Sequence, residues 1–322
     1  MTNFKNDIAV AMIFFNRPDC FEKVFKVVSE QRPSRLYLIQ DGPRANRPND
    51  KENIDKCRKI VENIDWDCMV TKDYSEENLG CGKRIFTGLS KVFEKEEFAV
   101  IIEDDILIGE SFLPFCIQMN ERYKNDDRIA QISGMNHLGV YEDCPYDYFF
   151  ANSGGAIWGW ATWRRVWNEL DWNMEIMSEP YIRRCLDYAL LPCNRGKDYN
   201  QRAMKERRDI LKGKAPSFWS LHFALYRALS SRLNIVPKYN LTANIGLTSD
   251  TTHGTDSINK VVKRMRVVFF GKIYNISMDL KHPQYIMDDE YYMKLQDKIM
   301  KPSKLVQFFE LFEKLYIKMF VR

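Results

Sequence analysis

The chain has 322 residues, of which 45% are hydrophobic and 29% are charged, and its formal net charge at pH 7 is +4. This composition is typical of a soluble globular protein, and so small a net charge argues against a nucleic-acid partner. The eight cysteines contain no Cys-x-x-Cys pair and no zinc-ligand spacing, so we expect reduced thiols and a cytoplasmic location.

Short apolar runs alternate with amphipathic helical stretches through the first half of the chain. The first run, 8–15, is too short to span a bilayer and follows no basic segment, so we interpret it as a strand and not as a secretion signal. We expect further strands at 35–40, 67–72 and 98–102, and helices at 18–30, 50–64 and 82–95. This alternation predicts an α/β fold with a parallel central sheet.

The second half is richer in aromatic residues and in helical patterns. Five of the seven tryptophans lie between Trp158 and Trp172, and Trp160, Trp163 and Trp167 have helical spacing. We expect helices near 178–190, 199–211 and 217–231, a strand at 233–237, and a loop rich in Gly, Thr, Ser and Asn at 244–257.

The C-terminal region is basic and ends in a helical pattern with a broad apolar face. Residues 260–322 contain 13 Lys or Arg and 7 Asp or Glu, a net charge of +6. A basic amphipathic helix of this kind indicates peripheral contact with the inner face of the cytoplasmic membrane, or docking of a partner. A helix that packs on its own domain is the alternative.

Three polar turns follow the first, second and fourth expected strands. They are Asn16-Arg17-Pro18, Asp41-Gly42-Pro43 and Glu103-Asp104-Asp105. Because ligands of parallel α/β sheets bind at the carboxyl ends of the strands, we expect these turns to gather at one edge. Packed acids after a buried strand suit a divalent cation with a sugar-nucleotide diphosphate, although a solvated acidic turn is the simpler alternative.

Several segments, taken in order, resemble bacterial GT-A-type glycosyltransferases, in the family-2-like group related to the Golgi N-acetylglucosaminyltransferase I. The resemblance covers about residues 7–256 and rests on "FNRPD", "QDGP", "NLGCGKRIFTGL", "VIIEDDILIGESFLPF", "GWATWRRVW" and "NLTANIGLTSDTTHGT". It implies a GT-A fold, Rossmann-like with a mostly parallel central sheet and flanking helices. Residues 1–135 would bind the nucleotide-sugar, 136–258 the acceptor, and 259–322 would be a basic helical tail.

The resemblance also implies roles for the polar turns. Asp105 would bind Mn²⁺ or Mg²⁺, Asp104 would approach the ribose, and Glu103 would act through water. Asp41 would hold the edge of the nucleobase. The turn Asn16-Arg17 would lie beneath the nucleotide.

Other positions gain donor-site or metal-site roles from the same resemblance. Lys83 or Arg84, at a helix N-terminus, would face the diphosphate, and a solvated helix start is the alternative. Gly154 and Gly155 would allow close backbone approach to the ligand. His253 would reach the metal or the diphosphate from a closing loop, unless it is incidental.

Tryptophans are expected to bind the acceptor. Trp158, Trp160 and Trp219 would stack on sugar rings, and their alternative is a place in the core.

The catalytic base is the one departure from the family pattern. Relatives carry an Asp where this chain has Ser220, and serine does not take a proton at neutral pH without a partner. Asp171 is the preferred replacement. The other candidates are Glu169, His222 and Asp209.

We therefore expect an inverting, metal-dependent transfer of a hexosyl or N-acetylhexosaminyl group. The donor would be a nucleotide-sugar, with UDP suggested by the resemblance, and the acceptor a hydroxyl of a cell-surface glycan, such as capsule or O-antigen, or of a lipid-linked oligosaccharide. The alternative that Ser220 keeps open is a catalytically degenerate relative that binds glycan or scaffolds a partner. A sugar-1-phosphate nucleotidyltransferase would require a Gly-rich basic loop after the first strand. This chain has "NRPDC" there, which argues against that class.

Overall fold

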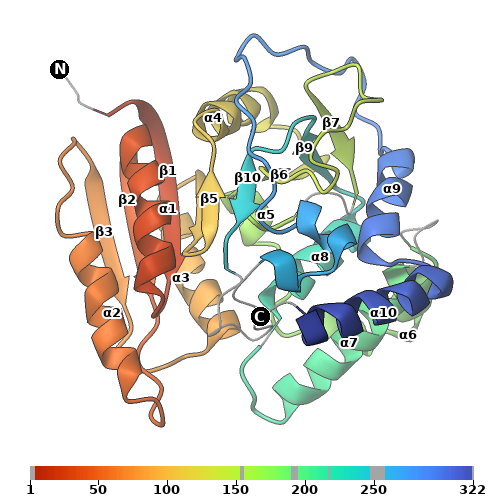
Figure 1. The fold of residues 1–322 in the computed structure, drawn as a ribbon, viewed down its shortest axis with the longest axis horizontal. Coiled ribbons are helices and arrows are strands. Elements are labelled where there is room, and N and C mark those ends of the chain that lie inside the picture. Colours follow the sequence, from red (N-terminus) through yellow and green to blue (C-terminus); the bar gives the residue numbers. More distant parts are fainter. Residues whose placement is uncertain (1–3, 153–155, 190–194, 217, 247–257, 321–322) are drawn as a thin grey trace.

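The computed structural model describes residues 4–152, 156–189, 195–216, 218–246 and 258–320, which form a mixed α/β fold with helices on both sides of a central sheet (Figure 1). The strands are β1 Asn6–Phe14, β2 Pro33–Gln40, β3 Met69–Tyr74, β4 Phe98–Glu103, β5 Ile106–Ile108, β6 Ile129–Ser133, β7 Tyr148–Ala151, β8 Trp160–Trp163, β9 Leu233–Pro237 and β10 Thr242–Asn244. The α-helices are α1 Pro18–Gln31, α2 Asn49–Ile60, α3 Cys81–Lys95, α4 Phe112–Tyr123, α5 Arg164–Trp167, α6 Pro180–Tyr188, α7 Arg195–Leu211, α8 Trp219–Ser230, α9 Glu290–Met300 and α10 Lys304–Phe320, and three 3₁₀ turns are η1 Glu175–Ser178, η2 Ile258–Lys260 and η3 Lys263–Val267.

The main sheet has eight strands in the order β3-β2-β1-β4-β8-β6-β9-β7. Strands β3, β2, β1 and β4 are parallel, β8 is antiparallel to both β4 and β6, β9 is parallel to β6, and β7 is antiparallel to β9. The predicted α/β sheet is thus confirmed as mostly parallel. Strands β5 and β10 form a separate antiparallel pair.

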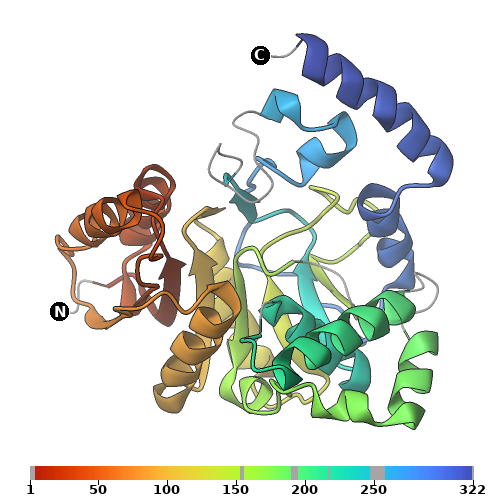
Figure 2. The ribbon, with the colours of Figure 1, turned by 90° about the horizontal axis from the view of Figure 1, so that it is seen from below.

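The chain reverses its direction across the sheet between β1 and β4. It runs outward through β2 and β3 and then returns to pair β4 with the other side of β1. Helices α1 and α2 cover one face of this part of the sheet and α3 the other (Figure 2). Such a switch point leaves a crevice outside the carboxyl ends of the two central strands, where ligands of α/β folds bind.

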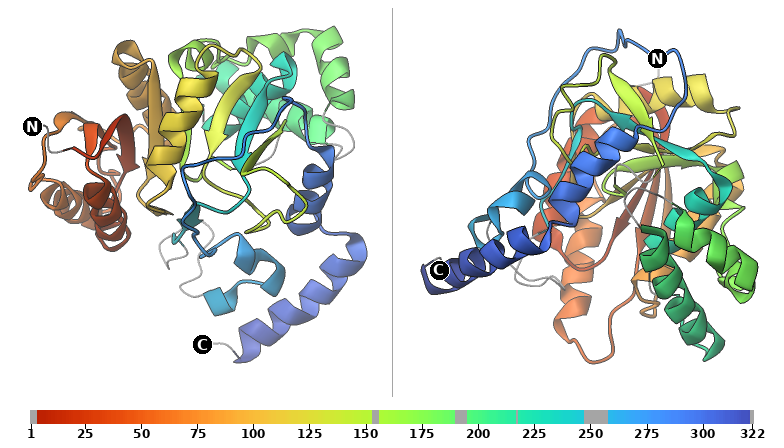
Figure 3. Two further views of the ribbon diagram at one scale, coloured as in Figure 1. Left: turned by 90° about the horizontal axis from the view of Figure 1, so that it is seen from above. Right: turned by 90° about the vertical axis from the view of Figure 1, so that its right-hand side faces the viewer.

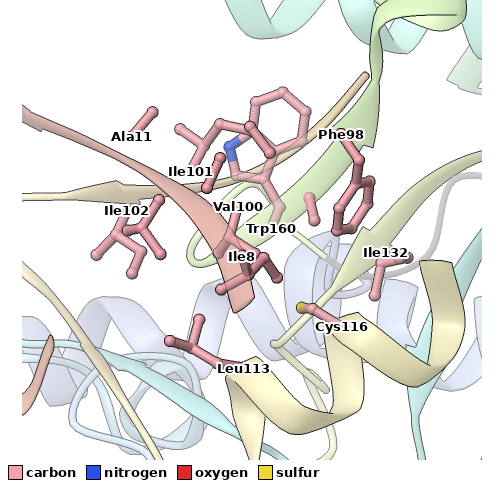
Figure 4. Close-up of a cluster of buried hydrophobic side chains, with 14 of the residues drawn as sticks. Ile8, Ala11, Phe98, Val100, Ile101, Ile102, Leu113, Cys116, Ile132 and Trp160 are labelled. Carbon is pink, nitrogen blue, oxygen red and sulfur yellow. The ribbon is translucent and has the colours of Figure 1, made fainter. Parts of the chain in front are cut away.

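Burial of both faces of β4 explains why its sequence is an unbroken apolar run. Val100, Ile101 and Ile102 are at most 1% exposed, because helices or loops cover both faces of the strand. Figure 4 shows these side chains around Trp160 of the neighbouring strand β8, with Leu113 and Cys116 of α4 beneath them. Strand β4 therefore ends as a rigid support for the acids that follow it.

The aromatic segment does not follow its helical spacing. Trp160 and Trp163 belong to strand β8, and only Arg164–Trp167 is helical. Pairing with β4 on one side and β6 on the other decides the backbone here, and this pairing overrides the local pattern.

The region 259–322 consists of two long helices preceded by a stretch that is largely irregular. Part of that stretch packs against the N-terminal half of the fold. Ser111 Oγ accepts from the backbone N–H of Ile276 at 2.9 Å, and Asp147 accepts from that of Lys281 at 2.6 Å. Only α9 and α10 resemble the expected helical tail, and both lie at the outer edge of the molecule (Figure 3).

Candidate functional site

The three polar turns meet at the carboxyl edge of the sheet, as their positions in the sequence predict. A cavity of about 380 Å³ opens there between the ends of β1, β2 and β4 and the start of α3. Its wall is formed by Ile13, Phe14, Phe15, Asp41, Arg44, Asn78, Gly80, Cys81, Arg84, Ile85, Glu103 and Asp104. We call it the switch-point pocket. It combines an apolar wall with carboxylates and one rim arginine.

Arg17 connects the turn after β1 with the acids after β4. Its guanidinium pairs with Asp104 and, at 2.9 Å, with Oδ2 of Asp105. The backbone N–H of Phe15 also donates to Oδ2 of Asp104 at 3.1 Å. Burial disfavours the charge on Arg17, but the two carboxylates outweigh it and raise the arginine pKa above its usual range. Arg17 therefore fixes the direction of both acids.

The acids carry more negative charge than Arg17 neutralises. Burial, reinforced by Asp105 and Asp104, raises the pKa of Glu103 to about 8. Burial also raises the pKa of Asp104 to about 6, although Arg17 acts in the opposite direction. Three carboxyls beside one cation leave a site that a further positive charge would stabilise.

The donor atoms at this edge fit a hard divalent cation. Carboxylate oxygens are the ligands that Mg²⁺ and Mn²⁺ prefer. Among the described residues, the side chain that donates a hydrogen bond to the Asp105 carboxylate is Arg17, at Oδ2. A Cβ on Gly246 would lie 2.1 Å from Oδ2 of Asp105, so a side chain at this position would displace that carboxylate. Within the described ranges, no three His, Cys, Asp or Glu side chains form a ready-made metal cage.

Asp41 holds the loop that leads into α3. Its Oδ1 accepts from the backbone N–H of Gly42 at 3.0 Å and of Leu79 at 2.9 Å. Its Oδ2 accepts from Gly80 N–H at 3.0 Å and from the amide of Asn78 at 3.1 Å. Asp41 thus shapes the pocket wall, and its contact with a nucleobase stays a prediction.

Arg44 is a pocket residue that the sequence did not single out. Its guanidinium bonds Asp50 at 2.7 and 2.8 Å, and Asn16 donates to the same carboxylate at 2.7 Å. The guanidinium also lies 5.3 Å from the centre of the Phe15 ring. This places a half-exposed cation at the pocket rim, in a loop whose sequence has no motif.

The two basic residues at the start of α3 differ in environment. Lys83 is exposed, which agrees with the alternative of a solvated helix start. Arg84 is 3% exposed, donates to the carbonyl oxygen of Gln40 at 3.1 Å and pairs with Asp73 at 2.9 Å. The solvated alternative is therefore wrong for Arg84, which supports the pocket from within the sheet edge.

A second cavity, of about 550 Å³, lies over the other half of the sheet, between α7, α8, α9 and the segment before β8. Trp158 and Ser220 line it together with Glu206, which is 4% exposed and accepts from the backbone N–H of Phe218 at 3.2 Å. Arg202 and Lys205 lie on its α7 side. We call it the α7–α8 pocket.

Ser220, which stands where relatives carry the base, lines this pocket, but none of the predicted replacement bases does. His222 is 2% exposed, its Nδ1 lies 3.0 Å from the carbonyl oxygen of Asp171, and burial lowers its pKa. The Asp171 carboxylate accepts from the backbone N–H of Ile176 at 2.9 Å. Glu169 accepts from Tyr226, and Asp209 pairs with Lys214. The carboxylate that does face the pocket is that of Glu206.

The tryptophans divide into one pocket residue and two core residues. Trp160 is 0% and Trp219 5% exposed, and their rings stack on each other with centroids 5.4 Å apart. Neither ring offers a face for an acceptor sugar, so the core alternative is correct for both. Trp158 lines the α7–α8 pocket and packs against Phe269, with ring centroids 5.1 Å apart.

Strand β10 and the residue after it link Trp158 of the α7–α8 pocket with Asp105, which follows Asp104 of the switch-point pocket. Thr242 Oγ1 donates to the carbonyl oxygen of Trp158 at 2.7 Å, and Asn244, two residues later, pairs with Ile106. The backbone N–H of Ile245 then donates to the carbonyl oxygen of Asp105 at 2.8 Å. The predicted site residues Gly154, Gly155 and His253 lie outside the described residues.

No protein-family model and no curated protein matches the chain. Among solved structures, it is similar to the 4-diphosphocytidyl-2C-methyl-D-erythritol synthase of Anaerococcus prevotii, with 12% identity and a TM-score of 0.30 over 55% of this chain and 75% of that one. It is also similar to a UTP-bound UGPase from Acinetobacter baumannii, with 11% identity and a TM-score of 0.34 over 74% of this chain and 88% of that one. Likenesses this weak carry no argument about the function of the chain.

Proposed function

We propose that the chain is a GT-A-type glycosyltransferase that uses a nucleotide-sugar donor and a divalent cation. The observation that carries this proposal is the group of acids at the β1–β4 switch point, where Arg17 orients Asp104 and Asp105 beside a cavity of about 380 Å³. A divalent cation would balance the negative charge that these acids leave, and the same cation would bind the diphosphate of a donor.

The donor would lie across the carboxyl ends of β1, β2 and β4. Phe15 and the neighbouring apolar wall suit a nucleobase, and Arg44 at the rim suits a phosphate. Asp105 would hold Mn²⁺ or Mg²⁺, which supplies Lewis-acid stabilisation of the departing nucleoside diphosphate. Arg17 keeps the carboxylates oriented, so that little reorganisation is needed when the donor binds.

The acceptor would occupy the α7–α8 pocket. We propose Glu206 as the base, because it is the buried carboxylate that faces this pocket. The acceptor hydroxyl oxygen forms a bond to the anomeric carbon, the bond from that carbon to the diphosphate oxygen breaks, and the hydroxyl proton passes to Glu206. Attack from the side opposite the leaving group inverts the anomeric configuration. The donor sugar is proposed as hexose or N-acetylhexosamine, and the acceptor as a cell-surface glycan or a lipid-linked oligosaccharide.

A release assay tests this proposal against other reactions. The protein is incubated with Mn²⁺ and each of a panel of UDP-, GDP-, CDP- and dTDP-sugars, with and without a mixture of glycan acceptors. Release of nucleoside diphosphate that increases with acceptor supports glycosyl transfer. In a parallel incubation with nucleoside triphosphates and a sugar 1-phosphate, release of pyrophosphate would instead show a nucleotidyltransferase. Donor binding without turnover would show a degenerate relative.

A further inference from the structure

Helix α10 presents its apolar side to solvent. Ten large apolar side chains between Leu305 and Phe320 are 40–67% exposed. Leu305, Phe309, Phe312 and Tyr316 recur at the spacing of one helix face. An apolar helix face normally turns toward the core, so this face lacks the cover that would make α10 an ordinary surface helix.

The contacts that attach α10 to the body come from its polar side. Glu310 is 8% exposed and pairs with Arg264 of η3. Glu313 Oε1 accepts from the backbone N–H of Lys263 at 2.7 Å. Both acids of the helix are therefore used against the body, and Figures 2 and 3 show α10 along the outer edge of the molecule. Packing on its own domain does not cover the apolar side.

The exposed charges on α10 and at the end of α9 are basic. Lys298 and Lys301 at the end of α9, and Lys304 and Lys314 on α10, are all exposed. An anionic lipid surface has hydrocarbon beneath charged head groups. It would bury the apolar side chains and would also attract the lysines electrostatically. The α10 helix of a second copy would cover the apolar side but would bring no acid to the lysines, because Glu310 and Glu313 already contact the body.

We propose that α10 lies flat in the interface of an anionic lipid bilayer, with the side that carries Phe309 and Phe312 in the acyl boundary and the lysines at the head groups. A 17-residue helix extends about 25 Å along such a surface. No helix in the described part of the chain is long and apolar enough to cross a membrane. The contact is therefore peripheral, and it holds whether or not the chain transfers sugars.

Sedimentation with vesicles tests the proposal on the full chain. Vesicles of phosphatidylcholine alone are compared with vesicles that also contain phosphatidylglycerol, at low and high salt. The variant Phe309→Glu/Phe312→Glu removes the apolar contact, and Lys304→Glu/Lys314→Glu reverses the flanking charge. Tyr188→Glu on α6 is the matched control, because Tyr188 is 70% exposed on another helix.

We expect the wild type and Tyr188→Glu to bind the anionic vesicles, with binding that weakens as salt rises. The double phenylalanine variant should bind about tenfold less or worse, and the double lysine variant should lose the preference for anionic lipid. Equal binding by all four proteins, or none by the wild type, would overturn the proposal. A wild-type dimer in light scattering that the phenylalanine variant abolishes would also overturn it, in favour of self-association.

Discussion

Replacing Arg17 with Met tests whether this residue holds the acidic cluster together. The side chain of Asp104 is 4% exposed. Without Arg17, its remaining hydrogen-bond donor among the described residues would be the backbone N–H of Phe15. Methionine keeps much of the volume of arginine, so the change removes charge more than packing. The expected result is a loss of stability in metal-free buffer.

Two limits set the size of that loss. Removing one partner of a buried ion pair costs about 3–5 kcal/mol. The orphaned carboxyl can instead bind a proton, which costs about 1.4 kcal/mol for each pH unit above the Asp104 pKa of about 6 in the wild type, a ceiling of about 1.4 kcal/mol at pH 7. Because proton binding is the lower of the two limits, we expect a loss of about 1.4 kcal/mol at pH 7.

The pH dependence follows from the same carboxyl. Burial raises the pKa of Asp104 to about 6 even with Arg17 present. Since the folded state then binds the proton more tightly than the unfolded state, stability falls as pH rises through the window from the unfolded pKa to the folded one. Removing Arg17 raises the folded pKa further, but Asp104 is already mostly protonated at pH 5 in the wild type, so the penalty of the variant should shrink to less than about 0.5 kcal/mol at pH 5.

Urea denaturation at pH 7 and pH 5 measures this penalty. Lys51→Met, at an exposed position of α2, is the control and should change stability by less than about 0.5 kcal/mol. Adding Asp104→Asn to the Arg17 variant should restore most of the loss, because the amide carbonyl still accepts from Phe15 N–H without a charge. A loss below about 0.5 kcal/mol at pH 7, or a loss at pH 5 as large as that at pH 7, would refute the reasoning.

Three further variants test the site. Glu206→Gln should lower kcat of sugar transfer about 100-fold or more with an unchanged KM for the donor, whereas Asp209→Asn should not; equal activity of both would remove Glu206 as the base. Trp160→Ala should destabilise the fold by about 3–5 kcal/mol, whereas Trp158→Ala should chiefly raise the KM for acceptor; the reverse pattern in denaturation and kinetics would contradict the division into core and pocket. Gly246→Ala should weaken Mn²⁺-dependent nucleotide binding in calorimetry, because the added Cβ displaces the Asp105 carboxylate, and wild-type affinity would show that this contact has no role.

Much of the fold was predictable because the buried parallel strands are unbroken apolar runs. The strand predicted at 98–102 corresponds to β4 Phe98–Glu103, and the helix predicted at 217–231 corresponds to α8 Trp219–Ser230. Strands β6 and β7 are short, and their sequences show little alternation of apolar and polar residues, so the sequence did not predict them. Strand β8 was misjudged because its pairing with two neighbours, and not its tryptophan spacing, determines its conformation.

The site was predictable where topology alone decides it. Acids and turns at the ends of neighbouring parallel strands must share an edge, whatever their side chains do. The bond from Arg17 to two acids depends on side-chain packing that no sequence spacing encodes. Glu206 lies in "KERRD", which has the composition of a solvated helix face, and only the packing of α7 against α8 buries it.

The most direct test of the account is a thermal-shift measurement with UDP, GDP, CDP and dTDP, each with and without Mn²⁺. Wild type, Asp105→Ala and the exposed-site control Asp65→Ala run side by side. A ligand at 100 times its Kd adds about 2.7 kcal/mol to stability, which for 322 residues raises Tm by roughly 4 °C. The account predicts such a rise for one nucleotide with Mn²⁺, kept in Asp65→Ala and lost in Asp105→Ala. No rise with any nucleotide, or a rise that Asp105→Ala retains, would contradict it.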